Sequence, residues 1–177
     1  MDISPPLVAF IGHSGSGKTT LIEKLIKKLR SDRIRVGAIK RSHHEIDIDK
    51  KGKDSYRLRQ AGSNPTMVAS ENFIGFMMET DEPVALADLA RQFRGKADII
   101  MVEGFKNESC SGAKVHRFMF GPPFGAGDGA GEADDDSIAG FIATGAQAER
   151  KTDKPLFQRD DVEALADWIK RNCLDLK

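Results

Sequence analysis

The feature that most constrains this chain is an eight-residue segment near its N-terminus, residues 12–19, which reads GHSGSGKT. Its fixed positions match the pattern G-x-x-x-x-G-K-[ST]. Five apolar residues, Leu7 to Ile11, precede it without polar alternation, as in a strand buried on both faces. Apolar residues at helical spacing follow it, with lysines on the opposite face, which indicates an amphipathic helix. A buried strand and a helix joined by such a loop predict a phosphate-binding P-loop.

Each residue type in this loop has a chemical reason. Glycines allow the tight turns that aim consecutive backbone N–H groups at an anion, and the helix N-terminus adds its positive dipole end. The ammonium of Lys18 can reach the β and γ phosphates, and the hydroxyl of Thr19 can ligate Mg²⁺. The predicted phosphate site consists of Gly12, His13, Ser14, Gly15, Ser16, Gly17, Lys18, Thr19 and Thr20. We therefore expect a nucleoside triphosphate and Mg²⁺ as ligands.

Segments of strand and helix character alternate along the rest of the chain. Val36–Ile39 is a second strand candidate and completes a βαβ unit. Ile99–Val102 is strongly apolar and predicts another buried strand. The remaining predictions are strands at 66–70, 73–78, 115–120 and 138–143, the first two as a hairpin, and helices at 55–61, 84–93 and 162–174. Asp160 is the expected N-cap of the last helix, with Glu163 three residues later.

This alternation predicts an α/β fold of the three-layer P-loop NTPase type, with a mostly parallel sheet and some antiparallel strands. A length of 177 residues and a hydrophobic fraction of 40% suit one core. We therefore expect a single nucleotide-binding domain over residues 1–177. Within it, residues 121–136 combine glycines with a cluster of acids, which favours a mobile loop.

Composition excludes several classes of function. Basic and acidic residues are equal in number, 27 of each, so no overall field attracts nucleic acid or an anionic membrane. No apolar run is long enough to cross a bilayer. The two cysteines, Cys110 and Cys173, fit no zinc spacing and are expected to be reduced thiols. We expect a cytoplasmic protein without nucleic-acid or membrane partners.

A P-loop protein needs a carboxylate near its metal ion, commonly at the end of a neighbouring buried strand. Glu103 directly follows the apolar run Ile99–Val102 and is predicted to contact Mg²⁺ through water. Gly104 would let the chain pass close to the γ phosphate, and Lys106 would lie over the phosphates. The alternative interpretations are an ordinary acid at a strand end and a surface lysine.

A polar segment, residues 40–54, follows the second predicted strand. Its candidate ligands are Lys40, His43, His44, Asp47, Asp49 and Asp54. Lys40 is expected at the same edge as the P-loop, because open α/β sheets bind ligands beyond the carboxyl ends of their strands. The two histidines and the first two aspartates either bind a metal or an oxo-anion, or belong to a solvated polar loop. Asp54 is a second candidate beside the metal.

Four motifs together resemble the MobB family, the adapter proteins of molybdopterin-guanine dinucleotide biosynthesis. They are Gly12–Thr20, Lys40–Asp49, Gly52–Ser55 and Val102–Lys106. Shorter similarities at 115–117 and 155–161 extend the resemblance over nearly the whole chain. Because many families share a P-loop, the resemblance depends mainly on the other three motifs.

The resemblance implies a GTP-binding adapter with weak GTPase activity in molybdenum cofactor biosynthesis. It implies a homodimer, GTP and Mg²⁺ as cofactors, and as partners the molybdenum cofactor guanylyltransferase and other molybdenum cofactor enzymes. By resemblance, Lys18, Asp54 and Glu103 are catalytic candidates, and Thr19, Asp54 and Glu103 are the candidate metal contacts. His43 and His44 then belong to a functional segment that contacts the ligand together with Lys40, Gly104 and Lys106.

The chain departs from the family pattern in three respects. Gly145 stands where an aspartate would help to hold guanine, and no N-K-x-D motif is present, although residues 152–155 partly resemble one. Arg41 and Ser42 stand where the family more often has a histidine and a polar or acidic residue. The sequence therefore leaves the base open between guanine and adenine.

Two other functions stay open on the residues alone. A small-molecule kinase would use ATP, Lys18 and Mg²⁺, with Arg57 or Arg59 near its acceptor, but no arginine-rich lid follows the third predicted helix. A non-catalytic binding module would use the nucleotide only to stabilise a shape that a partner binds. No glutamine or arginine finger stands out in the sequence, so we expect the isolated protein to hydrolyse nucleotide slowly.

Overall fold

Six strands form one sheet in the larger of two compact units of this chain. The structure, a computed structural model, describes residues 4–42, 46, 48–121, 138–143, 153–174 and 176. By its internal contacts the chain divides into a first unit, Met1–Arg41 with Ala85–Lys177, and a second unit, Ser42–Val84. We call them the sheet unit and the hairpin unit. The expected single domain over residues 1–177 stays a prediction.

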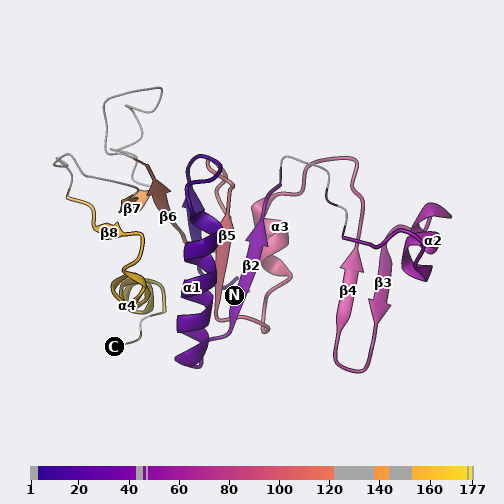
Figure 1. The fold of residues 1–177 in the computed structure, drawn as a ribbon, viewed down its shortest axis with the longest axis horizontal. Helices are drawn as coiled ribbons and strands as arrows, with labels where there is room; N and C mark the ends of the chain where they lie inside the picture. Colours follow the sequence, from indigo (N-terminus) through magenta and orange to yellow (C-terminus); the bar gives the residue numbers. More distant parts are fainter. Residues whose placement is uncertain are drawn as a thin grey trace. The chain divides into compact units, whose positions relative to one another are not determined.

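The strands of the sheet unit are all parallel. They are β1 (Leu7–Ile11), β2 (Val36–Lys40), β5 (Ile99–Glu103), β6 (Val115–Phe120), β7 (Ile138–Ala143) and β8 (Leu156–Gln158). Their order across the sheet is β2-β5-β1-β6-β7-β8 (Figure 1). The chain runs from β1 outward to β2 on one side and later to β6, β7 and β8 on the other. Since open α/β sheets bind ligands where the strand order reverses, the carboxyl end of β1 is the expected site.

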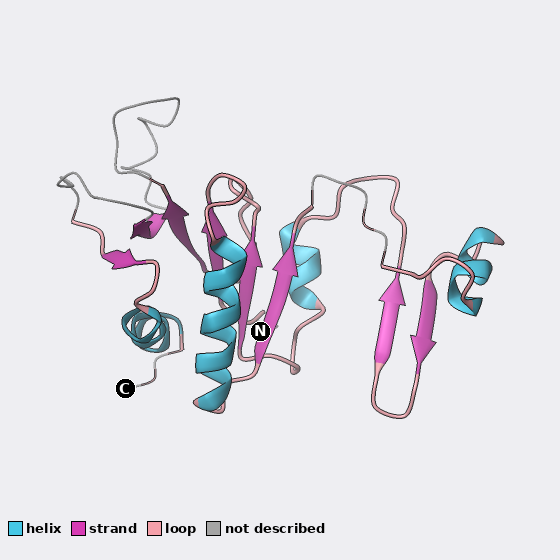
Figure 2. Cartoon of the chain, viewed as in Figure 1, coloured by secondary structure: helices cyan, strands magenta, loops and turns pink. Residues whose placement is uncertain are grey.

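Helices cover both faces of this sheet (Figure 2). α1 (Lys18–Ser31) and α4 (Val162–Cys173) pack on one face, and α3 (Leu86–Arg91) packs on the other. In β1, Val8 and Phe10 join the cluster under α1 and α4, whereas Leu7 and Ala9 join the cluster under α3. This alternation of side chains between two covered faces explains why the whole strand is apolar.

Aromatic rings fill the layer between α4 and the sheet. The ring of Phe118 stacks on Phe10 at a centroid distance of 5.8 Å and meets the edge of Trp168 at 5.0 Å. Phe157 of β8 contacts Phe118 edge-on at 5.8 Å. Such offset and edge-to-face pairs are the favoured aromatic geometries, so this cluster holds α4 and β8 on the sheet.

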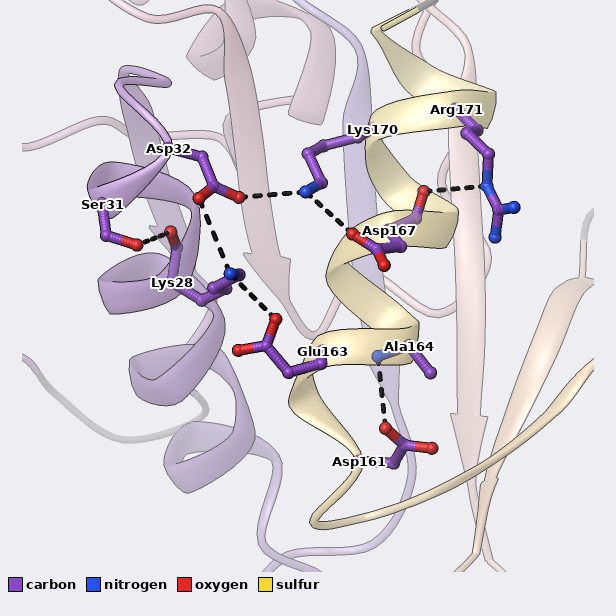
Figure 3. A network of polar contacts seen from close by, with 9 residues as sticks. All are labelled: Lys28, Ser31, Asp32, Asp161, Glu163, Ala164, Asp167, Lys170 and Arg171. Atoms are coloured by element: carbon purple, nitrogen blue, oxygen red, sulfur yellow. Dashed lines mark hydrogen bonds and ion pairs between the residues drawn. The ribbon is translucent and has the colours of Figure 1, made fainter. Parts of the chain in front are cut away.

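Ion pairs connect α4 to α1 (Figure 3). Lys28 Nζ lies 2.8 Å from Glu163 Oε2, and Lys170 Nζ lies 3.0 Å from Asp32 Oδ2. Hydrogen bonding to Asp167 and to Asp32 raises the pKa of Lys170, and the bond from Lys170 lowers the pKa of Asp32. Each pair keeps some exposure to solvent and therefore stabilises the fold little, but both connect α4 to the C-terminal half of α1 and its cap.

The N-cap predicted for α4 is wrong by one residue. Asp161 caps the helix, because its Oδ1 accepts a hydrogen bond from the backbone N–H of Ala164 at 3.2 Å. Asp160 instead pairs with Lys24 of α1 at 2.8 Å, and this hydrogen bond lowers the pKa of Asp160. Two adjacent aspartates offer the same local signal, and in the structure one of them caps α4 while the other pairs with a lysine of α1.

The hairpin unit consists of α2 (Asp54–Gln60) and the antiparallel strands β3 (Thr66–Ala69) and β4 (Ile74–Met77). Among its described residues only Thr66 is buried. Nine of its large apolar side chains are 41% to 76% exposed, and they are Ile46, Ile48, Leu58, Met67, Val68, Phe73, Ile74, Phe76 and Met78. An isolated two-stranded sheet is marginal in water, and this unit leaves many of its large apolar side chains exposed.

The predicted fold class is confirmed, because a mostly parallel sheet lies between helix layers and one antiparallel pair is added. The sequence missed β8, a three-residue edge strand in which only Phe157 is buried. No helix in the described part of the chain is long and apolar enough to cross a membrane.

Candidate functional site

The P-loop connects β1 directly to α1 at the carboxyl edge of the sheet. Gly12 has a φ of 142°, and a Cβ there would lie 2.8 Å from both the Cβ and the carbonyl oxygen of Phe120. Gly17 precedes α1 with a φ of 93°, in the left-handed region. Both fixed glycines of the motif therefore stand where a side chain would clash or strain the backbone. Residues 12–15 are exposed, which leaves the loop accessible to a ligand.

Lys18 folds back over its own loop. Its Nζ donates hydrogen bonds to the carbonyl oxygens of Gly12 (2.9 Å) and His13 (2.5 Å) and to Oγ of Ser16 (3.2 Å). These contacts hold the ammonium over the loop, where phosphate oxygens are better acceptors because they carry charge. The contribution of His13 in this structure is its backbone carbonyl.

Glu103 brings the P-loop and two neighbouring strands together. Its Oε2 accepts a hydrogen bond from the Thr19 hydroxyl at 2.7 Å, and its Oε1 lies 3.1 Å from Lys40 Nζ. These contacts follow from the sheet order, since β5 lies between β1 and β2 and Glu103 pairs in register with Lys40. Gly104 follows with a φ of 96°, and a Cβ there would lie 3.3 Å from the Cβ of Arg41. The residue that permits this close approach is therefore glycine.

The segment after β5 is fixed by Glu108, which the sequence did not single out. Oε1 of Glu108 pairs with Nη1 of Arg41, and Oε2 accepts a hydrogen bond from the Leu86 backbone N–H at 3.2 Å. The Glu108 carbonyl accepts a hydrogen bond from Nη2 of the buried Arg117. The Arg41 guanidinium lies over the Phe105 ring, 4.0 Å from its centroid. The Glu108 carboxylate thus contacts Arg41, the last residue of the sheet unit before the hairpin unit, and Leu86, the second residue of the sheet unit after it.

The sequence also missed Arg159, whose side chain lies against Gly17 of the P-loop. The Arg159 Cδ would be 3.2 Å from a Cβ built on Gly17. Arg159 directly follows β8, and strand ends line the ligand crevice of such a sheet. Because the sequence analysis does not predict β8, no sequence pattern places Arg159 at this edge.

The remaining predicted residues lie in the hairpin unit, after β5 or outside the described residues. Asp54 begins α2 in the hairpin unit, where its exposed carboxylate lies 3.6 Å from Nη1 of Arg57. Asp49 accepts a hydrogen bond from Ser55 at 2.9 Å within the same unit. Lys106 is exposed after β5. His43, His44, Asp47, Gly145 and residues 122–136 of the predicted mobile loop lie outside the described residues. A metal role for Asp54 stays a prediction.

A separate cavity lies within the hairpin unit. Its volume is about 250 Å³, and it is lined by Ile46, Ile48, Arg59, Ser63, Asn64, Phe76, Met77, Met78 and Glu79. Arg59 Nη2 and Glu79 Oε1 pair at 2.8 Å at this cavity, and most other lining side chains are apolar. Arg59, which the kinase alternative places near its acceptor, lines this cavity, whereas the described residues predicted to bind nucleotide or metal do not.

The geometry at the end of β1 suits an oxyanion with a hard cation. Exposed backbone and the Lys18 ammonium offer donors to the anion, and the Thr19 hydroxyl with the Glu103 carboxylate offers oxygen ligands of the kind that Mg²⁺ prefers. Within the described part of the chain, no group of three or more histidine, cysteine or acidic side chains gathers as a protein-only metal site. This donor set therefore fits a cation that takes part of its coordination from phosphate and water.

Comparison with known proteins adds sequence relatives over most of the chain. Residues 7–127 match the family described as MobB, molybdopterin guanine dinucleotide synthesis protein B. The molybdopterin-guanine dinucleotide biosynthesis adapter protein of Escherichia coli is 43% identical over 169 residues, which cover 93% of this chain and 91% of that protein. The protein of the same name from Haemophilus influenzae is 41% identical over 165 residues, covering 93% and 87%.

Solved structures agree with the fold. The crystal structure of Bacillus subtilis MobB superposes with a TM-score of 0.72 at 22% identity, covering 97% of this chain and 98% of the other. A MobB homologue from Bacillus stearothermophilus superposes with a TM-score of 0.67 at 20% identity, covering 99% of each chain. At these identities the likeness concerns the fold, and it supports the arrangement of strands and helices described above.

Proposed function

The chain belongs to the MobB family of molybdopterin guanine dinucleotide synthesis proteins, and from that premise we propose that it is a GTP-binding adapter with slow GTPase activity. The adapter part of the proposal is supported by relatives that are more than 40% identical over nearly the whole chain and are named as adapter proteins of this biosynthesis. The nucleotide part of the proposal rests on one observation, the hydrogen bond between Thr19 and Glu103 beside the P-loop.

Lys18 and the loop backbone bind the triphosphate in this proposal. The Lys18 ammonium, which donates to the Gly12 and His13 carbonyl oxygens, is within its own loop and available to the β and γ phosphates. Backbone N–H groups and the N-terminus of α1 add further donors, because the first turn of a helix leaves its N–H groups unpaired. The loop therefore neutralises and orients the phosphates.

Thr19 and Glu103 hold Mg²⁺ in this proposal. The ion, when bound, neutralises charge on the phosphate oxygens. Thr19 supplies a hydroxyl ligand, and Glu103 orients that hydroxyl and contacts the ion through water. Lys40 fixes the Glu103 carboxylate through a 3.1 Å ion pair. Hydrolysis at such a site is slow unless a side chain orients the attacking water, and P-loop proteins can receive that group from a partner.

The proposed partner is the guanylyltransferase of the molybdenum cofactor, with other molybdenum cofactor enzymes as further partners. An adapter needs a surface that nucleotide binding can alter. The segment after Glu103 includes Glu108, which contacts Arg41 and Leu86, and these two residues lie next to the boundaries of the hairpin unit in the sequence.

We place the protein in the cytoplasm. The Cys110 thiol is buried, burial raises its pKa, and in the cytoplasm it stays reduced.

We also propose a homodimer formed through the hairpin unit. This unit has many exposed apolar side chains and, among its described residues, only Thr66 buried. Surface of that kind is costly in water, and a second copy would bury it as a symmetric interface. The exposed side chains on β3, β4 and their turn, such as Met67, Phe73 and Ile74, are the expected centre of this contact.

Calorimetric titration with GTP and with ATP, each with Mg²⁺, tests the nucleotide part. We expect GTP to bind more tightly than ATP and the Lys18→Ala variant to lose binding of both. Lys27→Ala, an exposed lysine of α1, is the matched control and should bind like the wild type. Preference for ATP, with transfer of phosphate to an added small molecule, would contradict the proposal and favour a P-loop kinase.

The adapter part is tested by affinity between this protein and the purified guanylyltransferase, measured with and without GTP and Mg²⁺. We expect nucleotide to change that affinity, and Lys18→Ala to abolish the change while it leaves the fold intact by circular dichroism. Equal affinity with and without nucleotide would contradict a nucleotide-dependent adapter.

A further inference from the structure

We propose that Arg159 is a further nucleotide-binding residue, which contacts the α and β phosphates at the P-loop from the C-terminal part of the chain. The inference rests on the proposed binding of a nucleotide by residues 12–20. It adds a cation that no motif in the sequence marks, supplied by the connection between β8 and α4.

The first argument is the position of the side chain. A Cβ built on Gly17 would lie 3.2 Å from Cδ of Arg159 and 3.6 Å from its Nη1. The methylene stem of Arg159 therefore packs on the P-loop backbone, and its guanidinium lies beside Gly17, the loop residue directly before Lys18. Gly17 leaves room for this contact because it has no side chain and a left-handed backbone.

The second argument is the way in which the residues around Arg159 are held. Asp160 pairs with Lys24 of α1 at 2.8 Å, and Asp161 caps α4 through the Ala164 N–H at 3.2 Å. One turn further, Glu163 pairs with Lys28 at 2.8 Å (Figure 3). α1 is the helix that the P-loop starts, so these contacts attach the connection bearing Arg159 to the same element that presents the phosphate site.

The third argument is charge. Within the described part of the chain, the guanidinium of Arg159 has no hydrogen-bond or ion-pair partner, whereas the neighbouring Asp160 is paired. A guanidinium offers several donors in a planar fork that matches phosphate oxygens. Since Arg159 is exposed, no protein interaction has to break before it binds an anion.

The fourth argument selects the phosphates. In a P-loop the backbone N–H groups cradle the α and β phosphates, while the lysine reaches the β and γ phosphates. Arg159 packs against Gly17, which belongs to the backbone cradle, so it lies beside the α and β phosphates. It should therefore support diphosphate and triphosphate binding alike, unlike an arginine finger, whose contribution is to the transfer step.

The experiment compares Arg159→Ala, Arg159→Lys and the wild type by calorimetry with GDP, with GTP and with inorganic pyrophosphate, all with Mg²⁺. Arg30→Ala is the matched control, because Arg30 is exposed at the other end of α1, about 18 Å along the helix from Lys18. Lys18→Ala tests whether the P-loop itself binds the phosphates. Thermal unfolding of each variant checks that the fold is retained.

We expect Arg159→Ala to weaken GDP, GTP and pyrophosphate by a similar factor, roughly tenfold, because each loses the same charge-assisted contact. Arg159→Lys should restore part of the loss, and Arg30→Ala should bind like the wild type. The affinity of Arg159→Ala should also fall less steeply with added salt, since one cation fewer contacts the phosphates. If Arg159 had only a structural role, its replacement would leave the salt dependence of nucleotide affinity unchanged.

Several results would overturn this inference. Arg159→Ala with wild-type affinity, while Lys18→Ala loses binding, would remove Arg159 from the site and leave the proposed function standing. A loss for GDP but not for pyrophosphate would assign Arg159 to the base or ribose. A reduced hydrolysis rate at unchanged affinity would make it an arginine finger. If the wild type binds no nucleotide, the proposed function fails, and this inference fails with it.

Discussion

The hydroxyl of Thr19 donates a hydrogen bond of 2.7 Å to Oε2 of Glu103, although the two residues are 84 positions apart in the chain. Thr19 lies in the first turn of α1, and Glu103 ends β5, the strand directly beside β1. The same carboxylate pairs with Lys40 at the end of β2. The first turn of α1 and the ends of β5 and β2 thus meet at one acid, to which the proposed function assigns the contact with Mg²⁺.

The Mg²⁺ dependence of nucleotide affinity should fall when Glu103 loses its charge. Glu103→Gln keeps the size of the side chain and an acceptor for Thr19, but it no longer attracts a cation or Lys40. We expect the gain in GTP affinity on adding Mg²⁺ to shrink roughly tenfold. Titrations at several Mg²⁺ concentrations measure this, with Glu23→Gln on the exposed face of α1 as the control. An unchanged Mg²⁺ dependence would contradict a metal role for Glu103.

Stability should depend on Glu108 more than on other partly exposed acids. Glu108→Gln weakens the pair with Arg41 but can still accept from the Leu86 N–H, whereas Glu108→Ala loses both contacts. We expect free energies of unfolding lower by roughly 1 kcal/mol for Gln and roughly 2 kcal/mol for Ala, since the pair is part-exposed. Urea denaturation measures both, and Glu23→Gln should leave stability unchanged. Equal stability of all three variants would show that these contacts are not needed.

Oligomeric state should depend on the apolar side chains of the hairpin unit. Phe73→Ser combined with Ile74→Thr removes two exposed apolar side chains, and each is worth about 1.5–3 kcal/mol when fully buried. We expect the dimer dissociation constant, measured by sedimentation equilibrium, to rise at least tenfold. Leu156→Ser, an exposed apolar residue of β8 in the sheet unit, is the control and should dimerise normally. Normal dimerisation of the double variant would place the interface elsewhere.

The free energy of unfolding should decrease as the pH is lowered, and His116 accounts for part of this decrease. Burial lowers the pKa of His116 below its usual 6.5, and the charge of Lys114 lowers it further. Above about pH 7.5 the imidazole is almost entirely neutral in both the folded and the unfolded state, so it adds nothing to the pH dependence there. As the pH falls below that value, the unfolded chain takes up the proton first, and the free energy of unfolding decreases until the folded pKa is passed.

His116→Phe tests this dependence. Phenylalanine keeps a ring against Trp168, whose centroid lies 5.5 Å from that of His116, but it cannot be protonated. The variant should show a shallower loss of stability between about pH 7 and about pH 5 than the wild type, measured by urea denaturation at each pH. Parallel curves for the two proteins would mean that other groups account for the whole pH dependence.

Most individual elements could be predicted because their signals are local. The strand Leu7–Ile11, the glycine loop and the helix after it are contiguous, so apolar pattern and motif specify all three together. The hairpin at β3 and β4 was also predicted from its own residues. By contrast, β8 has three residues with one buried side chain, which is too short for a periodic signal. The N-cap is Asp161, and the adjacent Asp160 pairs with Lys24 of another helix, a contact that no local pattern records.

The residues of the candidate site likewise include some with a local signal in the sequence and some that only the tertiary structure places. The sequence by itself determined the P-loop with Lys18 and Thr19, because the motif holds its donors within eight consecutive residues. It also indicated Glu103, because an acid that ends a buried strand is a local pattern. Only the tertiary structure decided that this acid meets Thr19 and Lys40, since the order of parallel strands is set by crossover connections that local periodicity does not record. Arg159 reaches Gly17 for the same reason, through the packing of β8 and α4 on elements formed more than a hundred residues earlier.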